Sequence, residues 1–290
     1  KRVNNPVVIY LRRGFFVLKL NEMNVGIIGN GYVGKATALM CENHNLKIYD
    51  KDKSKSQDCT LQELVDFSDL IFICVPTPME KNGSCYTAIV ESVVSELANL
   101  KTDLNKLVIR STVPVGTSEK LKCNFMPEFL TEKNWRQDVV NCKEWVFGVH
   151  DEECFDKSVL LELANDRQIH YCTTKEAEIC KNIKNAFLAT KVSFFNEVYE
   201  LCDKLGVDYE QAKRLILLDE RINASHTEVP GHDGKKGFGG TCFPKDIRSL
   251  LFQMHNVDMD SYILKAAINR NETVDRPEKE WENNKGRSVV

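Results

Sequence analysis

The sequence of 290 residues contains no long apolar run. A helix that crosses a bilayer needs about 20 predominantly apolar residues. The longest candidates, VVIYL at residues 7–11 and FFVLKL at residues 15–20, are short and are separated by an Arg-Arg-Gly triplet. Neither provides the apolar core and the small-residue cleavage site of a signal peptide. We therefore expect no membrane partner. We also expect Met23 to be the natural first residue and residues 1–22 to be an extension without function.

Basic residues do not outnumber acidic ones. The 39 Lys and Arg residues stand against 42 Asp and Glu residues, the formal net charge is -3, and no basic stripe stands out. Nucleic-acid binding requires concentrated positive charge to neutralise phosphates. The sequence therefore argues against a nucleic-acid partner.

Paired cysteine motifs are also missing. The 11 cysteines are an odd number, lie mostly in apolar or helical patterns and include no pair of CxxC motifs. This pattern is typical of a reduced protein with neither a disulfide framework nor structural zinc. We therefore predict a cytoplasmic location and no metal site. Ten of the cysteines are interpreted as inert packing residues, and Cys242 is the exception.

The first half of the sequence does contain a regular alternation of strand and helix patterns. A hydrophobic content of 42% and a charged content of 28% are those of a globular chain, long enough for two domains. Short apolar runs separated by helical patterns predict a parallel sheet covered by helices on both faces. The predicted fold class is α/β, a Rossmann-like doubly wound parallel sheet. Strands are expected within residues 24–29, 46–50, 70–76 and 106–114, and helices within residues 34–44 and 86–100.

The second half of the sequence is mainly helical in pattern. Between residues 173 and 205, apolar residues recur at three- and four-residue steps and Gly206 follows as a stop, so we predict one long amphipathic helix. Further helices are expected from Tyr209 to about Asp219 and from Asp246 to about Asn269. Residues 271–290 are rich in charge and are predicted to form a frayed tail.

The motif GNGYVG stands between the first predicted strand and the first predicted helix. There the first glycine permits a tight turn, the second lets a pyrophosphate approach the backbone, and the third lets helix pack on strand. Asp50 ends the next predicted strand, where a carboxylate can bind an adenosine ribose and favours NAD over NADP. An ordinary tight turn is the alternative, but the strand, the helix and the acid are all in register. The predicted cofactor residues here are Gly29, Gly31, Tyr32, Val33, Gly34 and Asp50.

Lys181 and Asn185 lie four residues apart on the long predicted helix, so their side chains project from one face. Both could contact a single ligand. The alternative is a solvated polar face, which the spacing alone favours. Lys184 and Lys191 fall at other angles and do not extend the pair into a charged stripe, which favours a ligand-binding role.

The stretch GFGGTCFPKD surrounds one cysteine with glycines, a proline and two charges. The glycines let backbone and a small substrate come close to Cys242, and Pro244 can begin a helix because its missing N–H needs no partner there. A thiol at a helix N-terminus beside cationic groups is stabilised as the nucleophilic thiolate. Asp246 lies one turn further on the same face. We therefore predict that Cys242 is an accessible nucleophile.

A dinucleotide site and an accessible thiol together favour one reaction type. Removal of a hydride from an alcohol gives an aldehyde, and a thiolate can add to this aldehyde to form a thiohemiacetal. Loss of a second hydride gives a thioester, which water opens to a carboxylate and the thiol. Two alternatives remain open: a two-electron dehydrogenase of a hydroxy acid, which needs no Cys242, and a regulatory subunit that binds NAD without turnover.

Seven motifs, in order, resemble those of the UDP-glucose/GDP-mannose dehydrogenase family over about residues 24–269. They are GNGYVG, FICVPTP, STVPVGT, PEFL, AEICKNIKNAF, DERI and GFGGTCFPKD. The resemblance implies an NAD-dependent, four-electron oxidation of a nucleotide-sugar C6 alcohol to the uronate. UDP-glucose to UDP-glucuronate is favoured, with GDP-mannose or another nucleotide sugar as the alternative. It also implies an NAD-binding domain at residues 23–172 and an all-helical catalytic and dimerisation domain at residues 173–270, which would form a homodimer through the long helix.

The resemblance also implies roles for individual residues. The implied catalytic residues are Cys242 as nucleophile, Lys181 and Asn185 as oxyanion stabilisers, Asp246 in proton transfer with Thr112 close by, and Glu128 as general acid/base. The implied cofactor contacts outside the glycine turn are Lys55, Pro76, Thr77, Thr112 and Glu132. The implied substrate contacts are Glu128, Phe129, Leu130, Lys181, Asn185, Phe238, Gly239, Gly240 and, toward the substrate of a partner subunit, Arg221.

The sequence departs from the family pattern in places. Met126 stands where the family usually has Asn, and Lys133 replaces a family glycine. The third, C-terminal nucleotide-binding domain of the family is missing from the 290 residues. Either the protein is a short member that holds the nucleotide with a partner subunit and the loop from His226 to Lys236, or part of it is missing.

Overall fold

The computed structural model describes residues 7–10, 15–18, 22–57, 59–131 and 133–290. The chain divides into two compact units, which are described separately below. Unit 1 comprises residues 1–75, 93–110 and 118–174, and unit 2 comprises residues 76–92, 111–117 and 175–290.

Near the N-terminus, the described residues form a two-stranded antiparallel hairpin of β1 (Val7–Tyr10) and β2 (Phe15–Leu18). These strands lie in the segment that we predicted to be an extension without function. Much of that segment, residues 1–6, 11–14 and 19–21, lies outside the described residues.

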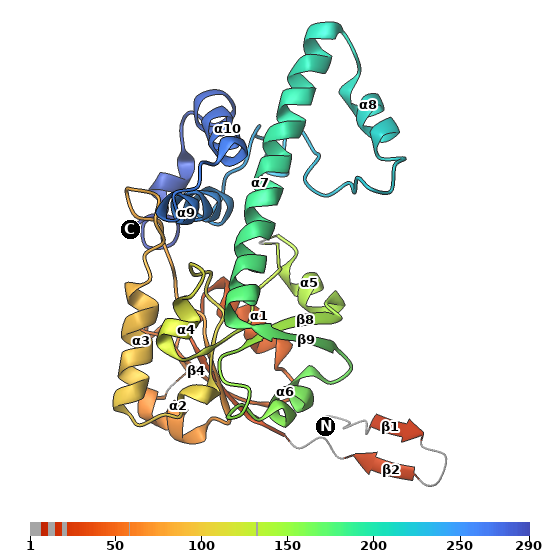
Figure 1. The fold of residues 1–290 in the computed structure, drawn as a ribbon. Coiled ribbons are helices and arrows are strands. Elements are labelled where there is room, and N and C mark those ends of the chain that lie inside the picture. Colours follow the sequence, from red (N-terminus) through yellow and green to blue (C-terminus); the bar gives the residue numbers. More distant parts are fainter. Residues whose placement is uncertain (1–6, 11–14, 19–21, 58, 132) are drawn as a thin grey trace. The chain divides into compact units, whose positions relative to one another are not determined.

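Unit 1 is built on a seven-stranded sheet with the order β4-β3-β5-β6-β7-β8-β9. Figure 1 shows β8 and β9 of this sheet side by side. The strands are β3 (Asn24–Ile28), β4 (Asn45–Tyr49), β5 (Leu70–Ile73), β6 (Leu107–Ile109), β7 (Asn124–Phe125), β8 (Glu144–Val149) and β9 (Gln168–Thr173). Counted from β3, the first five strands have the order 2-1-3-4-5 of a doubly wound fold, whose topological switch point lies between β3 and β5. The four strands predicted from the sequence, β3 to β6, and the predicted fold class are confirmed.

The sheet is mixed rather than purely parallel. Phe125 of β7 pairs with Gly148 of β8 in antiparallel register, whereas the other adjacent strands pair in parallel. The core on this sheet combines fully buried Val25, Ile27 and Phe72 with Phe147 of β8. Burial on both faces explains why the strands read as continuous apolar runs.

Helices connect most of these strands. They are α1 (Tyr32–Met40), α2 (Leu61–Phe67), α3 (Ala88–Asn99), α4 (Thr117–Leu121), α5 (Trp135–Asn141), α6 (Lys157–Ala164) and the 3-10 turn η1 (Leu104–Lys106). Sequence-local rules account for several of their ends. At α2, the Thr60 side chain accepts from the Glu63 N–H while the Glu63 side chain accepts from the Thr60 N–H, which is a complete capping box.

Unit 2 is dominated by α7 (Thr174–Leu205), a helix of 32 residues that confirms the predicted long helix. It is followed by α8 (Tyr209–Ile216), α9 (Phe243–Asn256) and α10 (Tyr262–Arg270). Apolar side chains from α7, α9 and α10 form one core that includes Ala189, Ile247 and Leu264. This core fixes α9, and therefore its N-terminal residues, against α7.

Two expectations for the C-terminal region are wrong. The helix predicted from Asp246 to about Asn269 is interrupted between α9 and α10, because the backbone of Asp258 takes a φ of 55° and ends the helical path. The tail is not frayed: after a π-type turn, η2 (Asn271–Asp275), comes the 3-10 turn η3 (Glu280–Asn283), whose Trp281 is 1% exposed. Burial of this large ring anchors the segment despite its high charge.

The end of the chain also pairs with backbone elsewhere in unit 2. The N–H of Met79 donates to the Ser288 carbonyl at 2.8 Å, and the N–H of Val290 donates to the Met79 carbonyl at 3.0 Å. The last residues are therefore hydrogen-bonded to the short loop that follows Pro76 and Thr77. Within the described part of the chain, no helix is long and apolar enough to cross a membrane.

Candidate functional site

The glycine turn between β3 and α1 has the geometry that the GNGYVG motif predicts. Gly29 has a φ of 93°, and a Cβ there would lie 2.6 Å from the Cys74 carbonyl oxygen. A Cβ on Gly34 would lie 1.9 Å from the Gly29 carbonyl oxygen, so α1 can pack this closely only with glycine at position 34. A Cβ on Gly31 would meet no atom within 4 Å, so this side of the turn is open for a ligand to approach.

Asp50 is held next to this turn by the residue between the first two glycines. One carboxylate oxygen accepts from the Asn30 N–H at 2.7 Å, and the other accepts from the Asp52 N–H at 2.9 Å. The Asn30 side chain donates to the Lys55 carbonyl at 2.6 Å. Asn30 therefore ties the turn to both Asp50 and Lys55, a role that the glycine motif itself does not reveal.

The PEFL segment forms a second predicted part of the site in unit 1. Glu128 is buried, and its carboxylate accepts from the N–H of Leu130, two residues on. Phe129 and Leu130 line a cavity of about 310 Å³ together with Met126 and other residues of unit 1. Glu132, a predicted cofactor contact, lies outside the described residues.

In unit 2, the loops after the predicted third and fourth strands are joined to each other. The Thr77 hydroxyl donates to the Thr112 carbonyl at 2.7 Å. The neighbouring Val113 carbonyl accepts from the Asn182 side chain of α7 at 2.9 Å. The predicted cofactor contacts Thr77 and Thr112 are thus fixed to each other and, through Val113, to α7, while Pro76 is exposed.

The predicted polar pair on α7 is buried rather than solvated. Lys181 is 4% exposed and Asn185 is 6% exposed, so the alternative of a solvated polar face is wrong. Asn185 donates through its side-chain nitrogen to Asp246 of α9 at 2.6 Å. Because buried polar groups are costly unless they have partners, this hydrogen bond offsets the burial of Asn185 and Asp246.

Asp246 is the centre of a charged cluster. It is 2% exposed, and its second carboxylate oxygen pairs with the Lys245 ammonium at 2.5 Å. Burial lowers the pKa of Lys245, but the nearby Asp246 carboxylate, followed by the thiols of Cys242 and Cys85, outweighs burial and holds that pKa above its ordinary value. Lys245 therefore remains a cation close to the predicted nucleophile. The sequence analysis counted it only among the cationic groups beside the thiol and did not name it as a site residue.

Cys242 is the N-cap residue of α9 and its thiol is exposed, as predicted. Its carbonyl accepts from the Asp246 N–H at 2.9 Å, which starts the helix, and Pro244 lies in the first turn. The helix N-terminus and Lys245 both favour negative charge here. Two other cysteines, Cys154 and Cys180, are also exposed, so the interpretation of all ten as packing residues is wrong for these two.

The glycine segment before Cys242 carries three predicted substrate contacts: Phe238, Gly239 and Gly240. Phe238 is 4% exposed and packs in the core of α7, α9 and α10, so its side chain is not accessible to a ligand. A Cβ on Gly240, which has a φ of 74°, would meet no atom within 4 Å. Arg221 belongs to a different part of unit 2, where its exposed guanidinium pairs with Asp219.

Comparison with known proteins assigns both parts of the chain to one family. Residues 51–163 match the UDP-glucose/GDP-mannose dehydrogenase family, NAD binding domain, and residues 175–273 match the central domain of the same family. A UDP-glucose 6-dehydrogenase of Bacillus subtilis is 30% identical over 297 residues, a match that covers 86% of this chain and 66% of the relative. A UDP-glucose 6-dehydrogenase of Rickettsia bellii is 29% identical, with 86% and 67% covered.

A solved structure shows the same fold. The UDP-glucose dehydrogenase of the archaeon Pyrobaculum islandicum superposes with a TM-score of 0.77 at 27% identity, covering 89% of this chain and 70% of that protein. The chain spans between 60% and 67% of the length of three curated relatives that it matches.

Proposed function

Because the chain belongs to the UDP-glucose/GDP-mannose dehydrogenase family, we propose that it takes part in the NAD-dependent oxidation of a nucleotide sugar. The favoured reaction converts the C6 alcohol of UDP-glucose to the carboxylate of UDP-glucuronate. The two named relatives carry that activity in their names. The observation that supports the proposal most is the burial of Lys181, Asn185 and Asp246. Asn185 of α7 is hydrogen-bonded to Asp246 of α9, the helix whose N-cap is exposed Cys242.

The glycine turn of unit 1 fits NAD. Gly31 leaves open space where the pyrophosphate would approach the N-terminus of α1, and Asp50 is held at the end of β4, where it would accept from the adenosine ribose hydroxyls. Bound NAD would supply a hydride acceptor for each of the two oxidations. The other proposed cofactor contacts are Gly29, Tyr32, Val33, Gly34, Lys55, Pro76, Thr77, Thr112 and Glu132.

Cys242 provides the covalent chemistry in this proposal. Its thiolate adds to the aldehyde carbon that the first oxidation forms, and the second oxidation turns the resulting thiohemiacetal into a thioester. Water then displaces the sulfur, which gives the carboxylate and regenerates the thiol. Lys181 and Asn185 stabilise the negative oxygen, Asp246 and Thr112 assist proton transfer, and Glu128 acts as general acid/base for the water.

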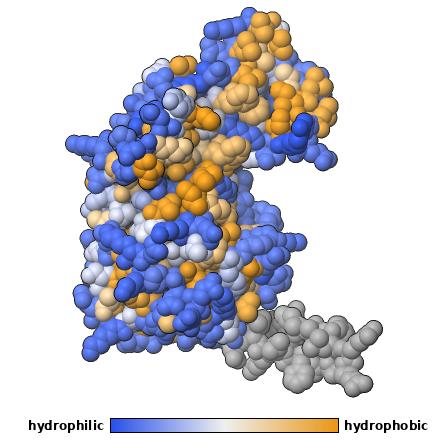
Figure 2. All heavy atoms as spheres, in the orientation of Figure 1, coloured by the Kyte–Doolittle hydropathy of each residue, from blue (hydrophilic) through white to orange (hydrophobic). Residues whose placement is uncertain are grey.

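We further propose that residues 23–172 and 173–270 act as cofactor and catalytic domains and that two copies join through α7. Apolar side chains on α7 that would be costly to leave in water are Ile183, Phe187, Phe194, Leu201 and Leu205, each more than half exposed. They follow one another at steps of four and seven residues, so they form one stripe on the helix. Figure 2 shows apolar surface over the C-terminal end of α7 and over α8. Arg221 would then reach the substrate of the partner subunit.

The direct test is NADH formation by the purified protein with NAD and a panel of UDP-, GDP- and TDP-sugars. We expect a signal with UDP-glucose and two NADH formed per sugar consumed. No NADH with any sugar nucleotide, combined with calorimetric NAD binding, would instead support a regulatory subunit without turnover.

The second test separates the two oxidations. Cys242→Ser is expected to abolish uronate formation and leave NAD affinity within about twofold. Full activity in Cys242→Ala would contradict the thioester route and would favour a two-electron dehydrogenase.

A further inference from the structure

The backbone just before Cys242 is held by a side chain from the segment that follows α10. Asn271 is 0% exposed, and its amide bonds twice to one residue. The Phe238 N–H donates to its oxygen at 2.8 Å, and its nitrogen donates to the Phe238 carbonyl at 2.9 Å. Both backbone groups of Phe238 thus have the partners that burial requires, without any β ladder.

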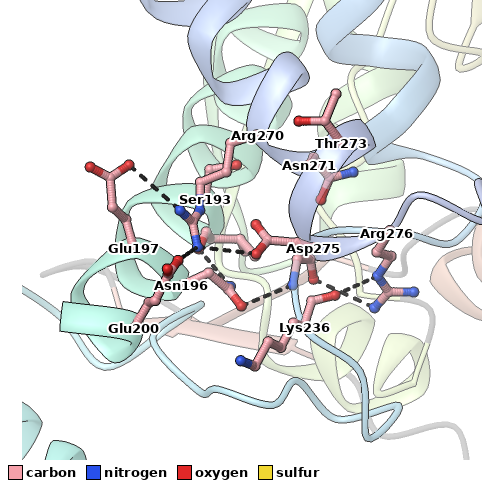
Figure 3. A network of polar contacts seen from close by, with 12 residues as sticks. Ser193, Asn196, Glu197, Glu200, Lys236, Arg270, Asn271, Thr273, Asp275 and Arg276 are labelled. Carbon is pink, nitrogen blue, oxygen red and sulfur yellow. Dashed lines mark hydrogen bonds and ion pairs between the residues drawn. The ribbon is translucent and has the colours of Figure 1, made fainter. Parts of the chain in front are cut away.

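Arg276 binds the backbone of Lys236, two residues before Phe238. It is 2% exposed, and its Nε donates to the Lys236 carbonyl at 2.7 Å. Its two terminal nitrogens pair with the carboxylates of Asp233 and Glu280, so the planar guanidinium has a fixed orientation. Figure 3 shows Arg276 and Lys236 joined in this network.

A third anchor comes from α7. Asn196 is 2% exposed, and its side-chain oxygen accepts from the Gly237 N–H at 3.0 Å. Three buried side chains from two separate segments therefore bind three consecutive backbone residues, 236 to 238. Loops that merely connect helices are normally solvated, so this degree of fixation is unusual for a connection.

The π-type turn η2 brings the two C-terminal anchors to the same place. The Arg276 N–H donates to the Asn271 carbonyl at 2.6 Å, which closes a turn across five residues. Arg270, just before the turn, pairs with Glu200 of α7 and with Asp275, each at 3.2 Å. These ion pairs fix the turn to α7, and such π-type turns occur frequently at functional sites.

This packing changes the interpretation of the glycines. A Cβ on Gly237 would lie 2.4 Å from Asn271 Oδ1 and 2.7 Å from Asp275 Cβ. A Cβ on Gly239 would lie 2.1 Å from Glu280 Oε1 and 2.3 Å from Arg276 Nη1. The space that we attributed to an approaching substrate is, at these two positions, filled by the C-terminal segment of the protein itself.

We propose that Asn271 and Arg276 are positioning residues for the Cys242 thiol. This inference rests on the proposed function, in which that thiol bonds to the substrate carbon. Phe238 is bound by Asn271, and α9 is packed in its core, so only residues 239–241 connect these two anchored points. Removal of either anchor lets this short connection, and with it the sulfur at the N-cap of α9, sample other positions.

The experiment uses Asn271→Ala and Arg276→Lys in the full chain. Alkylation of Cys242 by iodoacetamide is followed between pH 6 and 9 by peptide-resolved mass spectrometry, with exposed Cys154, in the turn before α6, as the internal reference. We expect both variants to slow alkylation of Cys242 at neutral pH at least threefold relative to Cys154 and to move its pH profile toward higher pH. We also expect kcat to fall at least tenfold while KM for NAD changes less than twofold.

Ser193→Ala is the matched control. It removes a buried hydrogen bond to α10, from the Ser193 hydroxyl to the Ala267 carbonyl at 3.2 Å, without touching the glycine segment. Unchanged Cys242 profiles in folded anchor variants, or an equal shift in Ser193→Ala, would overturn the proposal. If Asn271→Ala does not fold, Arg276→Lys provides the test, since it keeps a cation beside Asp233 and Glu280 and is therefore expected to fold. Alkylation needs no turnover, so an inactive wild-type protein would refute the proposed function while leaving this test intact.

Discussion

Lys245 shows how a single side chain can set the charge around a thiol. It lies three residues after Cys242, its pKa is raised by the neighbouring carboxylate and thiols against the effect of burial, and it is ion-paired with Asp246. Because its pKa is raised rather than lowered, it stays protonated throughout the neutral range. The thiolate of Cys242 therefore forms beside a permanent positive charge.

Lys245→Met tests this charge. We expect the alkylation rate of Cys242 at pH 7.5 to fall about tenfold, which corresponds to about 1.4 kcal/mol of lost thiolate stabilisation. Lys265→Met removes an exposed lysine that pairs with Asp260, and it should leave the rate unchanged. Equal rates in Lys245→Met and the wild-type protein would show that the helix N-terminus alone activates the thiol.

Two glycines of the GNGYVG motif, Gly31 at the N-cap of α1 and Gly34 within α1, serve different purposes. A Cβ on Gly34 would collide with the Gly29 carbonyl, which is backbone and cannot move aside, whereas one on Gly31 would enter open space. Gly34→Ala should therefore lower the melting temperature by several degrees, since forced overpacking typically costs about 1–3 kcal/mol. Gly31→Ala should leave the melting temperature nearly unchanged and weaken NAD binding at least tenfold. Thermal unfolding and NAD calorimetry on both variants separate the loss of stability from the loss of NAD affinity. The same outcome for both variants would contradict the different purposes of the two glycines.

The loop between α8 and α9 is expected to respond to pH through His226. Burial, followed by the positive charges of Lys191, Lys184 and His232, lowers the pKa of His226 from 6.5. A lowered folded pKa means that the neutral form contributes stability above pH 6.5 and that this contribution is lost as the pH falls through the folded pKa.

His226→Asn tests this contribution and suits the local backbone, since His226 has a φ of 62° and Asn tolerates positive φ. Between pH 7.5 and 5.5, we expect the free energy of unfolding to fall more in the wild-type protein than in His226→Asn, as measured by urea unfolding. His255→Asn, which removes an exposed histidine of α9, serves as the control. Parallel pH dependence in wild type and His226→Asn would contradict the assignment.

Local patterns made much of the fold and part of the site predictable. The glycine turn, the strands β3 to β6 and α7 follow from residue spacing, and the exposure of Cys242 follows from its polar, glycine-rich neighbours. The break after α9 did not follow, because it depends on one residue, Asp258, that adopts a positive φ. The antiparallel pairing of β7 and β8 rests on a strand of two residues, too short to show a pattern.

Contacts distant in sequence account for what was missed. Nothing near Asn271 in the sequence reveals that its amide binds the backbone of Phe238, 33 residues earlier. The tail was expected to fray because its high content of charged residues suggested that it is exposed to solvent, yet Arg276 and Trp281 are both buried. Asn30 was overlooked because it fills a variable position of the glycine motif, although it orients Asp50 through its backbone N–H.

On the scale of the whole molecule, the exposed stripe of α7 predicts association. Phe187→Glu and Phe194→Glu each place a charge in this stripe, so we expect the wild-type protein to be a dimer and both variants to shift toward monomer. Size-exclusion chromatography with light scattering gives the mass directly. Val140→Glu, at an exposed apolar position of α5, should remain a dimer. A monomeric wild-type protein at micromolar concentration would contradict the proposed homodimer.

The ordered segment after α10 has a practical consequence for anyone who trims this gene. An expression clone that stops at Arg270, the apparent end of the helical core, would delete Asn271, Arg276 and Trp281 together. The carbonyls of residues 236 and 238 would then lose their side-chain hydrogen-bond donors. Such a shortened product would keep every motif residue, but the backbone before its reactive sulfur would no longer be held in place. Inactivity of this product would therefore say nothing about the chemistry of the intact chain.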